Sequence, residues 1–205
     1  MIFLHGRGDT GDNWSFVFKH KAASPYIKYV FPHASVRPCT VEHGLPCPAW
    51  FDVFDFQMKK FDEPGIRTVV KQTHEMVRKE IEAGISSQRI VLSGFSQGGA
   101  VALYSALTFD KPLGGIVALS TYIPLPDKIS NEITEVNKNI PIFQTHGDSD
   151  MLLRKQFTGD VTANILSKIC ANHTYTVYKG LGHDANLEVL DTVLENVKRW
   201  VPPET

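Results

Sequence analysis

One five-residue turn constrains the fold of this chain more than any other feature. Residues 94–98 read Gly-Phe-Ser-Gln-Gly; they follow a short β-rich run at residues 89–92 and lead into a helical pattern at residues 97–107. A sharp strand-to-helix turn of this kind lifts its serine above the end of a strand, and the two glycines relieve the steric crowding. The turn therefore predicts a strand, an accessible Ser96 and a helix packed behind it.

The remaining pattern favours an α/β fold with a mostly parallel central sheet flanked by helices, because short apolar runs alternate with longer amphipathic ones. The expected strands are residues 2–4, 26–31, 89–92, 113–119, 140–145 and 174–178, and the expected helices are residues 65–82, 97–107, 154–169 and 187–200. Residues 36–56 hold several prolines and an aromatic cluster, which predicts a long functional loop. Since no repeat or long linker divides the sequence, we expect a single domain over residues 1–205.

Composition and charge exclude several classes of protein. The chain is 42% hydrophobic, and 21 Lys+Arg against 22 Asp+Glu leave a net charge of −1, which argues against a nucleic-acid partner. No apolar run reaches the roughly 18 residues of a membrane-spanning helix. Cys39, Cys47 and Cys170 are odd in number and lack CxxC spacing, so we expect reduced cysteines in a cytoplasmic protein.

A serine hydroxyl becomes a useful nucleophile at neutral pH only when a base removes its proton. In a turn of this type the acid and the histidine follow the serine in chain order, each just after a strand. His183 meets that condition, and both Asp148 and Asp150 do so within one loop. We expect His183 to take the proton of Ser96 and one of the two aspartates to orient the imidazole. Spacing alone leaves the choice between the aspartates open.

Acyl transfer also requires N–H donors for the developing oxyanion. One donor is expected at Gln97, directly after the serine, and the other at Arg7, in the glycine-rich turn of residues 5–8. A simple tight turn is the alternative interpretation of residues 5–8. That turn has neither the dinucleotide glycine pattern nor the lysine of a phosphate-binding loop, and the histidines and cysteines match no metal motif. We therefore expect no metal and no organic cofactor.

Several further motifs give the chain a recognisable family pattern: residues 3–11, 32–38, 50–52, 94–99, 146–150 and 182–183. With these residues the chain resembles, over nearly its whole length, the acyl-protein thioesterases of the lysophospholipase/carboxylesterase family of α/β-hydrolases. The resemblance selects Asp150 over Asp148, because the family's acid lies four residues after the histidine of its loop, here His146. It also implies the backbone N–H groups of Arg7 and Gln97 as oxyanion donors.

The resemblance implies an activity as well. Family members hydrolyse acyl thioesters on S-palmitoylated proteins, and also oxygen esters, through an acyl-enzyme on the serine that matches Ser96. An apolar channel near the serine holds the acyl chain, and Trp50, Tyr122 and Leu152 are candidates for its wall or rim, with ordinary core packing as the alternative. The expected partners are S-acylated proteins or small acyl esters, with transient contact with a membrane surface and the oligomeric state left open.

The chain also departs from the family pattern. Arg7 stands where relatives commonly carry leucine, and a cation in the channel would disfavour a long acyl chain. Tyr122 replaces a frequent tryptophan, and Met151 replaces the proline after the acid. We also expect the sheet to lack the family's first N-terminal strand and the chain to lack an early cysteine for lipid attachment. Two alternatives to a thioesterase remain: a carboxylesterase or lysophospholipase, and a catalytically silent scaffold that binds a lipid or partner.

Overall fold

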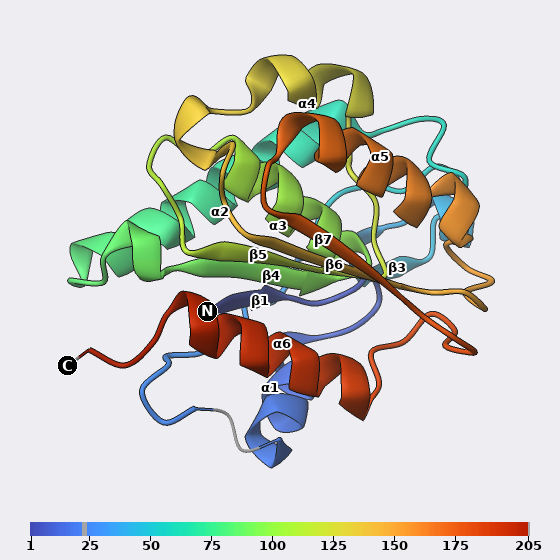
Figure 1. Ribbon diagram of the computed structural model, residues 1–205. Helices are drawn as coiled ribbons and strands as arrows, with labels where there is room; N and C mark the ends of the chain where they lie inside the picture. Colours follow the sequence, from blue (N-terminus) through green and yellow to red (C-terminus); the bar gives the residue numbers. More distant parts are fainter. Residues whose placement is uncertain (22–23, 205) are drawn as a thin grey trace.

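A five-stranded parallel sheet forms the centre of the protein (Figure 1). The computed structural model describes residues 1–21 and 24–204. The strands are β1 (Ile2–Leu4), β4 (Val91–Phe95), β5 (Gly115–Leu119), β6 (Ile142–Gly147) and β7 (His173–Tyr178), in the spatial order β1-β4-β5-β6-β7. Every neighbouring pair is parallel, so the carboxyl ends of all five strands meet at one edge of the sheet.

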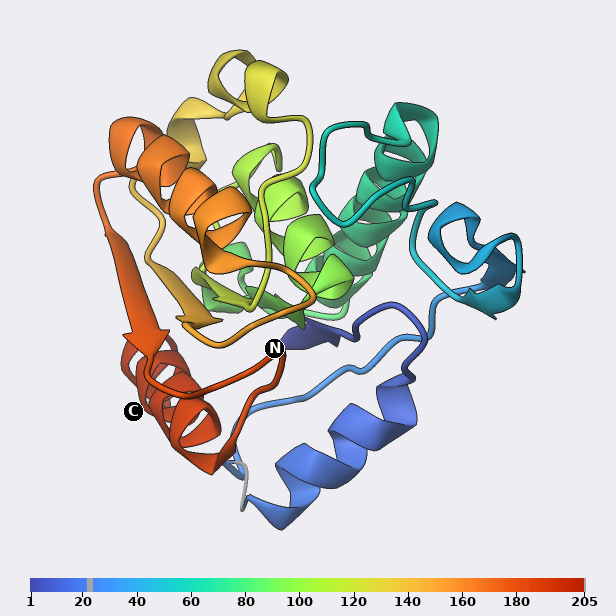
Figure 2. The same ribbon diagram turned by 90° about the vertical axis from the view of Figure 1, so that its right-hand side faces the viewer.

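Helices cover both faces of this sheet, which confirms the predicted fold class (Figures 1 and 2). On one face lie α1 (Gly11–His20) and α6 (Leu187–Trp200); on the other lie α2 (Glu63–Glu82), α3 (Gln97–Leu107), α4 (Pro126–Glu132) and α5 (Gly159–Ile169). Each face has its own apolar core, and α3 is buried along its whole length. No helix within the described residues combines the length and apolarity needed to cross a bilayer.

Most of the expected elements are present, although the helix expected at 154–169 begins only at Gly159 and α4 was not expected. Two further differences lie at the N-terminal end. The helices expected at 97–107 and 187–200 have the predicted bounds. The strand expected at 26–31 is wrong: only Val30 forms a bridge, with Ile2. The aromatic rings of Tyr29 and Phe31 instead pack against Phe18 of α1, a helix that the periodicity did not reveal. Tertiary packing therefore decides the structure of this segment.

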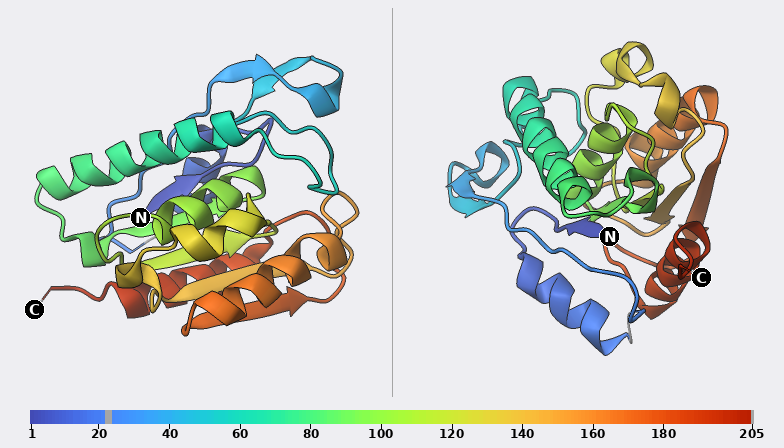
Figure 3. Two further views of the ribbon diagram at one scale, coloured as in Figure 1. Left: turned by 90° about the horizontal axis from the view of Figure 1, so that it is seen from above. Right: turned by 90° about the vertical axis from the view of Figure 1, so that its left-hand side faces the viewer.

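The expected loop at residues 36–56 contains a small antiparallel hairpin of β2 (Val36–Pro38) and β3 (Pro46–Pro48). Figure 3 places this hairpin at the margin of the molecule, on the β1 side of the sheet. Across it Cys39 and Cys47 form a disulfide, with Cα atoms 6.5 Å apart. The expectation of reduced cysteines is wrong for this pair, because hairpin pairing brings together two cysteines whose spacing carries no motif. The cysteine pattern thus gives no support to a cytoplasmic location.

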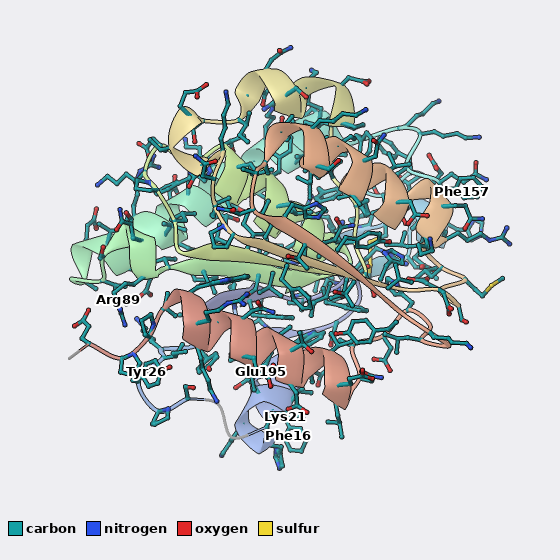
Figure 4. All side chains as sticks on the ribbon, in the orientation of Figure 1. Phe16, Lys21, Tyr26, Arg89, Phe157 and Glu195 are labelled. Carbon is teal, nitrogen blue, oxygen red and sulfur yellow. A yellow bond between two sulfur atoms is a disulfide. The ribbon has the colours of Figure 1, made fainter. Side chains whose placement is uncertain are left out.

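The aromatic core on the α1 side of the sheet predicts that two phenylalanines of α1 contribute very differently to the free energy of unfolding. Phe18 is 2% exposed and packs against Phe3, whereas Phe16 is 64% exposed (Figure 4). Replacing Phe18 with alanine should lower the free energy of unfolding by about 3 to 5 kcal/mol, because it removes a buried ring and leaves a cavity. Phe16→Ala is the matched control and should change it by less than about 0.5 kcal/mol. Equal effects in urea denaturation would contradict the core described here.

Candidate active site

The turn between β4 and α3 has the strained geometry that its glycines predict. Ser96 adopts φ 53° and ψ −121°, a backbone conformation that residues other than glycine rarely adopt. A Cβ at Gly94 would lie 2.4 Å from the carbonyl carbon of Gly98, and one at Gly98 would lie 2.1 Å from the carbonyl oxygen of Leu4. Both positions therefore require glycine, and their close packing holds Ser96 at the carboxyl end of β4.

His183 is in hydrogen-bond contact with both Ser96 and Asp150. Its Nδ1 lies 2.7 Å from Oδ2 of Asp150, and its Nε2 lies 2.9 Å from Oγ of Ser96. Because a carboxylate only accepts hydrogen bonds, the ring carries its hydrogen on Nδ1 and leaves the Nε2 lone pair facing the serine hydroxyl. This is the arrangement in which an imidazole can remove the serine proton.

Asp150 is held as a carboxylate in a buried position. The residue is 3% exposed, and its Oδ1 accepts hydrogen bonds from the backbone N–H groups of Leu152 and Leu153 at 2.9 and 2.8 Å. His146, fully buried, places its Nε2 3.3 Å from Oδ2. Burial acts to raise the pKa of Asp150, but the hydrogen bonds from His146 and His183 outweigh it and hold the pKa well below its usual range.

Asp148, the competing acid in sequence terms, has a different environment. Its side chain is exposed, and its Oδ1 accepts from the backbone N–H of Gly180 at 2.7 Å and from the hydroxyl of Ser149 at 2.9 Å. These contacts connect the loop after β6 to the loop after β7. The carboxylate that contacts His183 is that of Asp150.

The turn after β1 lies beside the serine turn, and Arg7 and Gln97 line the same cavity as Ser96. Gly6 is packed so closely that a Cβ there would lie 3.1 Å from the Phe95 ring. The backbone oxygen of His5 accepts from the Trp50 indole at 2.8 Å. These contacts fix the turn of residues 5–8 relative to the first turn of α3.

The side chain of Gln97 connects the serine turn to the segment after the hairpin. Its Oε1 accepts from the backbone N–H of Trp50 at 3.0 Å, and its Nε2 donates to the backbone oxygen of Phe51 at 2.7 Å. Because both ends of the buried amide are satisfied, the segment is held against the N-terminus of α3. Trp50 thereby supports the site from within the core and does not contribute to the described lining of the cavity.

A cavity of about 100 Å³ adjoins Ser96 and His183. Of the residues expected in the acyl channel, Tyr122 and Leu152 line it. Sequence analysis missed a further group of apolar residues that line it: Val53, Phe56, Met58, Phe95 and Leu153. Val53 and Phe56 belong to the segment expected to be a functional loop, so the sequence did hold a signal for these two. The other three could be assigned to the cavity only from the tertiary structure.

A second hollow of about 260 Å³ shares Phe56 and Leu152 with the first and is also lined by Met151, Arg154 and Phe157. Figure 4 shows Phe157 at the end of the molecule toward which the strands run. Three apolar side chains of this hollow, those of Met151, Leu152 and Phe157, are exposed.

Comparison with known proteins identifies the family of the chain. The sequence pattern of the Phospholipase/Carboxylesterase family matches residues 1–201. The acyl-protein thioesterase 1 of Neurospora crassa is 37% identical over 213 residues, covering 98% of this chain and 86% of the relative. That of Schizosaccharomyces pombe is 42% identical over 154 residues, covering 75% of this chain and 69% of the relative.

Solved structures give the same result at the level of the fold. Arabidopsis thaliana SOBER1 superposes with a TM-score of 0.92 at 29% identity, covering 98% of this chain and 97% of that chain. Zea mays acyl-protein thioesterase 2 superposes with a TM-score of 0.84 at 25% identity, covering 98% of this chain and 92% of that chain. These matches confirm the resemblance drawn from the motifs.

The two aspartates of the loop after β6 provide a test of the site geometry. Asp150→Asn should slow the reaction of Ser96 with a fluorophosphonate probe by about a thousandfold or more, because an amide cannot hold His183 in the required tautomer. Asp148→Asn, the matched control two residues away, should slow it by less than about tenfold. The measurement is the rate of adduct formation by intact mass, and equal rates for the two variants would sink the assignment of Asp150.

Proposed function

The chain belongs to the Phospholipase/Carboxylesterase family and is a hydrolase, and from this we propose that it cleaves acyl thioesters through a covalent acyl-enzyme on Ser96. The observation that carries the proposal is the continuous hydrogen-bonded series from Ser96 through His183 to the buried Asp150. Since the family match spans residues 1–201 and both helical layers pack on one sheet, we further propose one catalytic domain.

In the proposed first step, Oγ of Ser96 attacks the thioester carbonyl while Nε2 of His183 takes the hydroxyl proton. The carbonyl oxygen becomes an oxyanion, for which the backbone N–H groups of Arg7 and Gln97 are the proposed donors. As the tetrahedral intermediate collapses, the carbon–sulfur bond breaks and the imidazolium returns its proton to the leaving thiolate. Asp150 stabilises the imidazolium throughout, because it stays ionised at neutral pH.

The second step releases the acyl group as a carboxylic acid. A water molecule takes the place of the departed thiol, His183 removes its proton, and the resulting hydroxide equivalent attacks the ester carbonyl of Ser96. Collapse of this second intermediate returns the proton to Oγ of Ser96. The proposed catalytic cycle therefore uses only these side chains, the backbone donors and water.

The proposed substrate class is an acylated cysteine of a protein, since curated relatives that match most of this chain carry the name acyl-protein thioesterase. The second hollow, with its half-exposed apolar side chains, supports binding of a polypeptide next to the serine. The family description supports oxygen esters as the alternative substrate. Hydrolysis of thioester and oxygen-ester pairs with the same acyl chain separates the two, and a higher kcat/KM on the oxygen ester would favour the alternative.

Labelling of Ser96 tests the proposed mechanism directly. The wild-type protein should form one fluorophosphonate adduct, and Ser96→Ala should form none while its thioester hydrolysis falls by at least about a thousandfold. Ser149→Ala is the matched control, because Ser149 is an exposed serine in the loop of the acid, and it should label like the wild type. A folded wild-type protein that does not label would overturn the proposed function.

Arg7 should limit the length of the acyl chain. Arg7 lines the small cavity, and its guanidinium lies 5.5 Å from the centre of the Phe56 ring and pairs with Glu42 at 2.6 Å. Arg7→Leu should raise the ratio of hexadecanoyl to butanoyl thioester hydrolysis by about tenfold, because a long hydrocarbon no longer has to pass a desolvated cation. Glu42→Gln keeps the cation and is the control, with an expected ratio close to that of the wild type. An unchanged ratio in Arg7→Leu would contradict this role.

A further inference from the structure

The cavity beside Ser96 has a polar feature that the hydrolytic mechanism does not use. Tyr122 follows β5 and is 3% exposed, and its side chain lines the cavity together with Ser96 and His183. Its hydroxyl is buried and has no hydrogen-bond partner among residues 1–21 and 24–204. A buried hydroxyl without a partner destabilises the protein, so one that persists at a substrate cavity points to a ligand that completes it.

Arg7 adds a second polar group to the same wall. Arg7 lines the same cavity as Tyr122. Burial raises the pKa of Tyr122, and the positive charge of Arg7 opposes that rise. The charge of Arg7 is already balanced by Glu42, with Nη1 of Arg7 2.6 Å from Oε1 of the carboxylate. The wall of the cavity thus includes Tyr122, whose buried hydroxyl lacks a partner within the described residues, and Arg7, a cation that already has its counter-ion.

The apolar residues of the cavity indicate which part of a ligand lies between Ser96 and the Tyr122 hydroxyl. Val53, Met58 and Leu153 line the cavity and suit the methylene groups of an acyl chain. A volume of about 100 Å³ is well below the roughly 300 to 1,000 Å³ of sites for drug-sized ligands, so the part of an acyl chain that the cavity encloses is short. A short saturated chain would fill the cavity and leave the Tyr122 hydroxyl unpaired.

We propose that this cavity selects short acyl groups that carry a neutral oxygen acceptor, such as a ketone, near their far end, and that the Tyr122 hydroxyl donates to that oxygen. A carboxylate is a poorer fit, because the pair of Arg7 and Glu42 is already neutral and a further negative charge would have to be desolvated. The inference rests on the proposed function, since it names the acyl group that Ser96 receives.

The test uses acyl thioesters of N-acetylcysteamine in matched pairs. Each oxoacyl substrate (3-oxobutanoyl, 4-oxopentanoyl or 5-oxohexanoyl) is compared with the partner in which a methyl group replaces the ketone oxygen. The quantity measured is the ratio of kcat/KM between the two members of a pair. Dividing the wild-type ratio by that of Tyr122→Phe cancels the intrinsic reactivity of the substrates.

For at least one pair, the ratio should fall about tenfold in Tyr122→Phe, because the variant keeps the ring and removes the donor. The methyl substrate of that pair should be hydrolysed faster by the variant, since the unpaired hydroxyl is gone. Tyr178→Phe is the matched control: the Tyr178 hydroxyl donates to Thr192 within α6, and its loss should leave every ratio unchanged.

Two results would overturn the inference while leaving the proposed function intact. One is an equal ratio for wild type and Tyr122→Phe in all three pairs, and the other is faster hydrolysis of a succinyl thioester than of every oxoacyl substrate. Absence of any Ser96-dependent thioester hydrolysis is a separate result that overturns the proposed function as well. A circular dichroism spectrum like that of the wild type, with a thermal unfolding midpoint no lower, establishes that Tyr122→Phe is folded.

Discussion

The close approach of α3 to β1 and β4 is the constraint on which the rest of the site depends. Gly94 and Gly98 leave so little space that a Cβ at either position would lie within 2.4 Å of neighbouring backbone. This contact forces Ser96 into φ 53° and projects its side chain beyond the end of β4. The helix behind the turn maintains this strained conformation, because α3 is buried along its whole length and lies within the core.

Parallel strands then bring the other groups to the same place. Arg7 follows β1, Tyr122 follows β5, Asp150 follows β6 and His183 follows β7, so four loops converge on the serine turn at one edge of the sheet. The imidazole needs no large movement to reach either neighbour, since both of its hydrogen bonds are already formed. Preorganisation of this kind lowers the cost of reaching a charged transition state.

The segment after the hairpin holds the serine turn and the turn after β1 in place, a role that the sequence motifs did not predict. Gln97 binds the backbone of Trp50 and Phe51 through both ends of its amide, and the Trp50 indole donates to His5 in the turn after β1. The same segment carries Val53 and Phe56 into the wall of the cavity. Further back, the Cys39–Cys47 disulfide closes the loop that presents Glu42 to Arg7. Chain positions far apart in sequence thus shape one small cavity.

The sequence by itself determined the features that depend on local pattern: the alternation of strands and helices, the serine turn, and the chain order of Ser96, an acid at Asp148 or Asp150, and His183. Periodicity and glycine spacing encode these directly, because each depends on residues close in the chain. Only the tertiary structure decided that Trp50 is a support within the core, that Tyr122 keeps a buried hydroxyl unpaired within the described residues, and that residues 26–31 form no strand. Those outcomes depend on contacts between distant segments, and no local pattern specifies which distant side chains will meet.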